Sequence, residues 1–85
     1  MYRIIISNSA EKDMERLPAT VVKRVGNAID KLAEQPRPSG CKKLKASKEN
    51  LWRIRVGDYR VIYLIADEIE VIDVRRVRNR KDVYE

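Results

Sequence analysis

Apolar and polar positions repeat with two different periods along this chain. In the first half, the β-branched and aromatic residues 2–6 predict a strand, and Ser7, Asn8 and Ser9 can each cap a following helix. Apolar residues then recur at helical spacing on either side of Pro18, which predicts a short helix ending there and a second helix capped by Thr20. The apolar faces consist of Ala10, Met14 and Leu17 in the first helix, and of Val21, Val25, Ala28, Ile29 and Leu32 in the second.

The second half alternates with a period near two, which predicts strands. We expect antiparallel strands at residues 51–56, 59–65 and 69–77, with the two-residue turn Gly57–Asp58 joining the first pair and a turn near Asp67–Glu68 before the third. Residues 35–40 hold two prolines and a glycine and close the second helix, whereas residues 78–85 are too polar for a core strand. The pattern predicts a single α+β domain over residues 1–85, with two N-terminal helices packed on one face of a small, mainly antiparallel four-stranded sheet.

The two-residue turn sets the register of the predicted hairpin. It places Arg55 opposite Arg60, and directly opposed residues share a face of the sheet. One face is then apolar and packs on the helices, while Arg53, Arg55 and Arg60 gather on the other face near the turn. The apolar face comprises Trp52, Ile54, Val56, Tyr59, Val61, Tyr63 and Ile65.

Directly opposed arginines repel each other, and a bound anion between them would offset that repulsion. Arg75 joins this group if Ile72 and Val74 face the helices. The alternative is that these arginines extend into solvent or pair with carboxylates such as Asp73. Further cations follow in the tail at Arg78, Arg80 and Lys81, and Tyr84 near the end can either stack on an exposed base or merely pack over the core.

Composition narrows the classes of function. The chain has 19 Lys and Arg against 13 Asp and Glu, a net charge of +6, which favours a polyanionic partner. The basic stretch 42–48 is either a solvated loop or a phosphate contact. With Cys41 as the sole cysteine and no histidine, we expect no disulfide, no metal or other cofactor and no His-dependent triad. No signal or spanning segment is visible, so we expect a cytoplasmic protein with no membrane partner.

Several ordered segments resemble one family. The run LWRIRVGDYRVIY, the terminal NRKDVY, the early MYRIIISNSAEKDMERL and the KKLKAS loop together are similar to the RelE branch of the RelE/ParE toxins, and the resemblance covers nearly the whole chain. It implies a fold like that of microbial ribonucleases. It also implies an activity, the metal-independent cleavage of messenger RNA in the ribosomal A site by attack of a ribose 2′-hydroxyl on the adjacent phosphate.

The resemblance also implies residue roles. Arg60 matches the family's phosphate-stabilising arginine, Arg80 the arginine that assists the leaving oxygen, and Tyr84 the tyrosine that stacks on the substrate. Arg53 and Arg55 stand where well-studied members have lysines. An arginine stays protonated, so charge stabilisation is the expected role and the general base is left open. Lys42, Lys43, Lys45, Arg75, Arg78 and Lys81 are expected to bind RNA or the ribosome.

A second departure lies at Arg78–Asn79, where many relatives have Gly-His, so one possible proton donor is missing. The implied partners are the ribosome and messenger RNA, a cognate antitoxin with acidic and apolar residues, and operator DNA only through the antitoxin complex. Two alternatives stay open: a ParE-like inhibitor of DNA gyrase with the same fold, and a non-catalytic nucleic-acid-binding protein whose arginines only contact phosphates.

Overall fold

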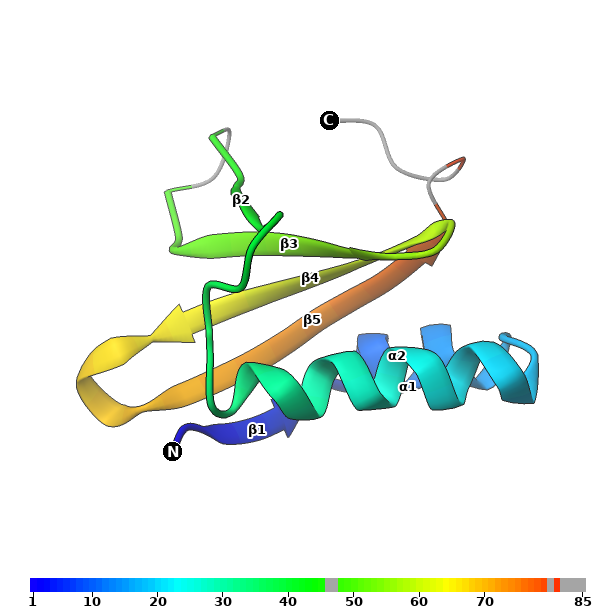
Figure 1. Cartoon of the computed structure of the whole chain (residues 1–85), viewed down its shortest axis with the longest axis horizontal. Coiled ribbons are helices and arrows are strands. Elements are labelled where there is room, and N and C mark those ends of the chain that lie inside the picture. Colours follow the sequence, from blue (N-terminus) through cyan, green and yellow to red (C-terminus); the bar gives the residue numbers. More distant parts are fainter. Residues whose placement is uncertain (46–47, 80, 82–85) are drawn as a thin grey trace.

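The computed structural model describes residues 1–45, 48–79 and 81 and shows an α+β arrangement. Its sheet has the strand order β1-β5-β4-β3-β2, and Figure 1 shows both helices on the same side of the long strands. The predicted fold class is confirmed, although the sheet has five strands rather than four and β1 runs parallel to β5. The elements are β1 Arg3–Ile6, α1 Asn8–Glu15, α2 Ala19–Leu32, β2 Lys42–Lys43, β3 Leu51–Val56, β4 Tyr59–Ala66, the 3-10 turn η1 Asp67–Ile69, and β5 Val71–Asn79.

The two helices begin in different ways. Ser7 caps α1, because its hydroxyl accepts the N–H of Ala10 at 3.1 Å. The prediction that Thr20 caps the second helix is wrong. α2 begins at Ala19 after Pro18, whose carbonyl accepts the N–H of Val22 at 3.0 Å. Proline suits this position because a helix start leaves its first N–H groups without intrahelical acceptors in any case.

The apolar face of the hairpin packs against the helices as predicted. The register of β3 and β4 confirms Val56 opposite Tyr59 and Arg55 opposite Arg60. Tyr63 is fully buried, and its hydroxyl donates to the carbonyl of Pro36 at 2.7 Å. Buried side chains of both helices and of the three long strands form one core, comprising Ala10, Val25, Ile29, Leu32, Ile54, Val61, Tyr63, Ile65, Ile72, Val74 and Val77.

The later strands depart from the predicted boundaries. Residues 67–69 form η1, and Glu70 has a φ of 53°, so β5 begins only at Val71. Pairing with β4 continues to Asn79, which places Arg78 inside a strand that we expected to stop at residue 77. The register shifts between Ile62 and Tyr63, so one residue of β5, Arg75, has no partner on β4.

Two smaller features concern the edge of the sheet and the length of the helices. Lys42 and Lys43, predicted as part of a loop, form a two-residue edge strand against β3. Neither α1 nor α2 is long and apolar enough to span a membrane, and the described residues contain no other α-helix.

Candidate nucleic-acid interface

Cross-strand pairing places three arginines in one row. Arg60 of β4 lies directly opposite Arg55 of β3 on one side and Arg78 of β5 on the other. Directly opposed residues share a face, and their neighbours Ile54, Val61 and Val77 are buried under the helices. The arginine row, comprising Arg55, Arg60 and Arg78, therefore lies on the sheet face turned away from the helices. In the described part of the chain, neither Arg55 nor Arg78 has an ion-pair partner.

The neighbouring row holds further cations. Lys42, Arg53, Ile62 and Arg76 lie opposite one another across four strands. Arg53 belongs to the predicted face, but it is only 4% exposed and its Nη1 donates to the carbonyl of Gly40 at 3.4 Å. Sequence alternation gives the face of a side chain but not what covers it, and so the burial of Arg53 was not predicted. Its charge can act on the row at short range, whereas Arg55 is exposed to a ligand.

Arg75 takes the alternative arrangement that the sequence left open. Its Nε donates to Asp73 at 2.9 Å, and its Nη1 lies 3.1 Å from Glu49. The hydrogen bond to Asp73, opposed by partial burial, raises the pKa of Arg75 further above its usual range. A guanidinium held by two carboxylates is a weaker phosphate ligand than the exposed Arg55.

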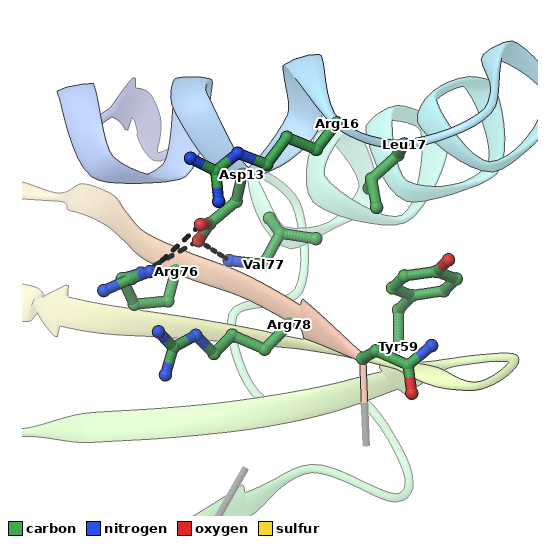
Figure 2. Close-up of a pocket in the computed structure, with 8 residues that line it drawn as sticks. Asp13, Arg16, Leu17, Tyr59, Arg76, Val77 and Arg78 are labelled. Atoms are coloured by element: carbon green, nitrogen blue, oxygen red, sulfur yellow. Dashed lines mark hydrogen bonds and ion pairs between the residues drawn. The ribbon is translucent and has the colours of Figure 1, made fainter. Parts of the chain in front are cut away.

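A carboxylate of α1 binds the edge of β5 beyond the residues that pair with β1. Asp13 accepts hydrogen bonds from Arg76 Nε at 2.8 Å and Nη2 at 3.0 Å, and from the backbone N–H of Val77 at 2.9 Å (Figure 2). Burial favours a higher pKa for Asp13, but the hydrogen bonds from Arg76 and Val77 and the charges of Arg76 and Arg78 outweigh it, so the pKa is lowered. Sequence reasoning missed this pair because it depends on the shifted register of β5.

A cleft opens where α1 meets the end of β5. Its volume is about 540 Å³, and its walls carry cationic, amide, aromatic and apolar groups. Figure 2 shows the guanidinium groups of Arg16, Arg76 and Arg78 on one side of this cleft and the ring of Tyr59 on the other. This α1–β5 cleft is lined by Asp13, Arg16, Leu17, Tyr59, Arg76, Val77, Arg78 and Asn79.

The remaining predicted residues fall in different places. Lys42 shares the face of the arginine row, whereas Lys43 lies opposite Trp52 and therefore points to the other face. Lys45 is exposed in the loop after β2. Lys81 is exposed, and its backbone N–H donates to Asn79 Oδ1 at 3.0 Å. Arg80 and Tyr84 lie outside the described residues. Among those that are described, no cluster of three or more Asp, Glu or Cys side chains is arranged to hold a metal ion.

Comparison with known proteins identifies toxins as the relatives of this chain. A family model described as the ParE toxin of the type II toxin–antitoxin system parDE matches residues 4–84. Toxin RelG of Mycobacterium tuberculosis is 30% identical, covering 98% of this chain and 95% of the relative. Toxin RelE of the same organism is 34% identical, covering 98% of this chain and 86% of the relative.

Solved structures of toxin–antitoxin complexes share the fold. The archaeal RelE–RelB complex from Pyrococcus horikoshii OT3 contains a chain with a TM-score of 0.83 and 30% identity, covering 96% of this chain and 98% of that one. The intact RelBE complex of E. coli contains one with a TM-score of 0.80 and 25% identity, covering 93% and 96%.

Proposed function

Because this chain belongs to the RelE/ParE family of type II toxin–antitoxin toxins, we propose that it cuts messenger RNA in the ribosomal A site and so stops translation. The observation that carries the proposal is the arginine row, in which Arg60 lies between Arg55 and Arg78 on the sheet face turned away from the helices. Three guanidinium groups in one row repel one another, and a phosphodiester placed among them would relieve that repulsion.

The proposed reaction is an internal phosphoryl transfer. The ribose 2′-oxygen attacks the adjacent phosphorus, the bond from phosphorus to the 5′-oxygen breaks, and the products are a 2′,3′-cyclic phosphate and a free 5′-hydroxyl. A proton leaves the 2′-hydroxyl and another reaches the 5′-oxygen. Arg60, with Arg55 and Arg78 beside it, would stabilise the negative charge that develops on the phosphorane oxygens. Arginine stays protonated, so these groups stabilise charge and do not remove the proton.

Other site residues complete the proposal. Arg53 would add positive charge beside the arginine row rather than touch the substrate, because it is buried. Arg80 and Tyr84 keep the roles that the family resemblance implies, assistance to the leaving oxygen and stacking on a base. Lys42, Lys45 and Lys81 are exposed and suited to contact ribosomal RNA, with Lys43 and Arg75 as weaker candidates. The arginines supply the positive charge, so the proposed chemistry needs no metal.

A cognate antitoxin is the proposed protein partner. The solved relatives named above are toxin–antitoxin complexes, and the net charge of +6 favours an acidic segment. Covering the arginine row with carboxylates would block phosphate binding and neutralise its repulsion. Contact with operator DNA would then run through the antitoxin.

The test compares arginine variants in a translation reaction. Arg60→Ala, Arg55→Ala and Arg78→Ala should each abolish or strongly reduce messenger cleavage, read by primer extension at ribosome-occupied codons, and should relieve growth arrest. The antitoxin should still bind each variant, since two of the three arginines in the row remain. Arg3→Ala is the matched control, since Arg3 is an exposed arginine on β1, two strands away from β4. Cleavage that persists in all three row variants would refute the site.

The same experiment separates a second candidate. The matching family model is described as a ParE toxin, and such a toxin would act on DNA gyrase instead of RNA. Growth arrest with double-strand DNA breaks and intact messengers would establish that function. Salt-dependent nucleic-acid binding with neither RNA nor DNA damage would establish a non-catalytic binder.

A further inference from the structure

We propose that the α1–β5 cleft binds a nucleotide of the substrate RNA next to the one being cleaved, with Arg16 and Arg78 holding its phosphate. This inference rests on the proposed ribonuclease function and extends it from one phosphate to two. Arg78 belongs both to the arginine row and to the cleft wall, so the two sites are continuous around the free edge of β5.

The charge distribution in the cleft favours a phosphate beside Arg16 and Arg78. Asp13 is satisfied by Arg76 and Val77, which leaves Arg16 and Arg78 as the cleft cations without a carboxylate partner in the described part of the chain. They come from different elements, α1's end and β5, and Figure 2 shows them above and below the Asp13–Arg76 pair. Two guanidinium groups that belong to different elements but lie on the same side of the cleft can bind one phosphate together.

The rest of the lining favours a base rather than an acidic peptide. Tyr59 presents an aromatic ring on the opposite wall, next to the apolar Leu17. Asn79 accepts from Lys81 through Oδ1, so its amide N–H groups are the part left to meet a base edge. Aromatic stacking combined with phosphate contacts is the usual way proteins hold single-stranded RNA, and the volume of about 540 Å³ accommodates a nucleotide.

Binding of short RNA analogues by the full-length toxin tests this directly. A 2′-O-methyl dinucleotide has one phosphodiester and a trinucleotide has two, and neither can be cleaved because the attacking hydroxyl is blocked. In the wild type, the trinucleotide should bind more tightly than the dinucleotide and should shift the NMR signals of the Asn79 side-chain amide and the Val77 N–H. In Arg16→Ala, the gain in binding affinity from the dinucleotide to the trinucleotide should fall about five- to tenfold. The slope of the logarithm of trinucleotide affinity against the logarithm of salt concentration should drop in magnitude by about 0.7.

The controls separate this inference from the proposed function. Arg3→Ala removes the same charge opposite Val71, at the other end of β5 from Arg78, and should leave this gain in affinity unchanged, while Arg16→Lys should recover only part of it. Because the analogues cannot be cut, an Arg16-dependent gain stands even if the toxin proves not to cleave RNA. An Arg16→Ala variant that keeps the full gain overturns the inference. An oligoglutamate peptide that binds the cleft as tightly as the trinucleotide also overturns it, because the cleft would then be a binding surface for an acidic protein.

Discussion

Asp13 of α1 and Arg76 of β5 form a two-point ion pair at the place where β1 has ceased to pair with β5. The last residue of β5 that pairs with β1 is Val74. Beyond it, Ser7 donates its hydroxyl hydrogen to the Arg75 carbonyl, and Asp13 accepts the Val77 N–H. Ser7 and Asp13 therefore bind backbone groups at the edge of β5 that a neighbouring strand would otherwise bind. They fix the end of β5, where Arg78 lies in the arginine row.

Removing this carboxylate should loosen the end of β5. Asp13 is 13% exposed and Arg76 39% exposed, so Asp13→Ala leaves the Val77 N–H without its acceptor and Arg76 without its partner. We expect the free energy of unfolding to fall by about 1–2 kcal/mol, since the half-exposed guanidinium regains water. Urea unfolding measures this loss. Glu11→Ala, at an exposed position on the same helix, is the control and should change little; an equal loss there would mean that helix charge, not the edge contact, is responsible.

Asp13 also makes the stability of the fold depend on pH. Because the pKa of Asp13 is lowered in the folded protein, its ionised form stabilises the fold above the unfolded-state pKa of about 4, and this contribution is lost as the pH falls through the folded value. Asp67, whose pKa is lowered by its hydrogen bonds with Arg37 and Tyr2, acts in the same direction. Asp13→Asn should flatten the decline of stability between about pH 5 and pH 2. A slope identical to that of the wild type would contradict the assignment.

Two glycines should respond to alanine in opposite directions. Gly57 has a φ of 60°, and an added Cβ would lie 3.4 Å from Arg24 Nη2, so Gly57→Ala should cost about 1–2 kcal/mol. Gly26 lies within α2, and apart from the adjoining backbone of the helix nothing lies within 4 Å of an added Cβ, so Gly26→Ala should stabilise by about 0.5–1 kcal/mol. Thermal unfolding of both variants checks the pair. A stabilising Gly57→Ala would show that the turn does not need its left-handed conformation.

The hairpin was predictable because a single local feature determines it. Gly57 and Asp58 form a two-residue turn, and this alone sets Arg55 opposite Arg60 and Val56 opposite Tyr59. The position of Arg78 could not be predicted from local sequence, because it depends on the register shift between Ile62 and Tyr63, and no local pattern indicates that shift. The parallel pairing of β1 with β5 joins residues nearly seventy positions apart. Long-range pairings of this kind follow from packing of the whole chain rather than from any one segment.

The site was predicted in the same uneven way. The pattern placed Arg53, Arg55 and Arg60 on one face, and the register agrees. It did not reveal that Arg53 is buried against the loop at Gly40, or that carboxylates hold Arg75. The cleft formed by α1 and β5 has no signature in the sequence, because Arg16 and Tyr59 belong to elements that only tertiary packing brings together.

The arginine row should lower the stability of the free protein. Arg55 lies directly opposite Arg60, and like charges at that spacing are destabilising. Arg55→Gln should therefore raise the free energy of unfolding by about 0.2–1 kcal/mol at low salt, and added salt should shrink the difference by screening. Urea unfolding at two ionic strengths measures both effects, with Arg3→Gln as the control. An Arg55→Gln variant less stable than the wild type would mean that the charges on this face are already compensated within the free protein.

At the other end of the sheet, Arg37 joins the loop after α2 to the start of β3. It makes two contacts with Asp67, at 2.8 and 3.3 Å, and its guanidinium lies 5.0 Å from the centre of the Trp52 ring. Tyr2 also donates to Asp67, and this hydrogen bond is the main reason that the pKa of Tyr2 is raised.

Arg37→Ala should uncover the only tryptophan of the chain. The ion pair is about half exposed and screened by water, so its loss should change stability little, while acrylamide should quench Trp52 more strongly because one face of the indole loses its cover. Asp67→Asn should produce part of the same increase, since it frees Arg37 to leave the ring. Asp30→Asn, at an exposed position of α2, is the control. Quenching unchanged in Arg37→Ala would mean that the cation does not shield the ring in solution.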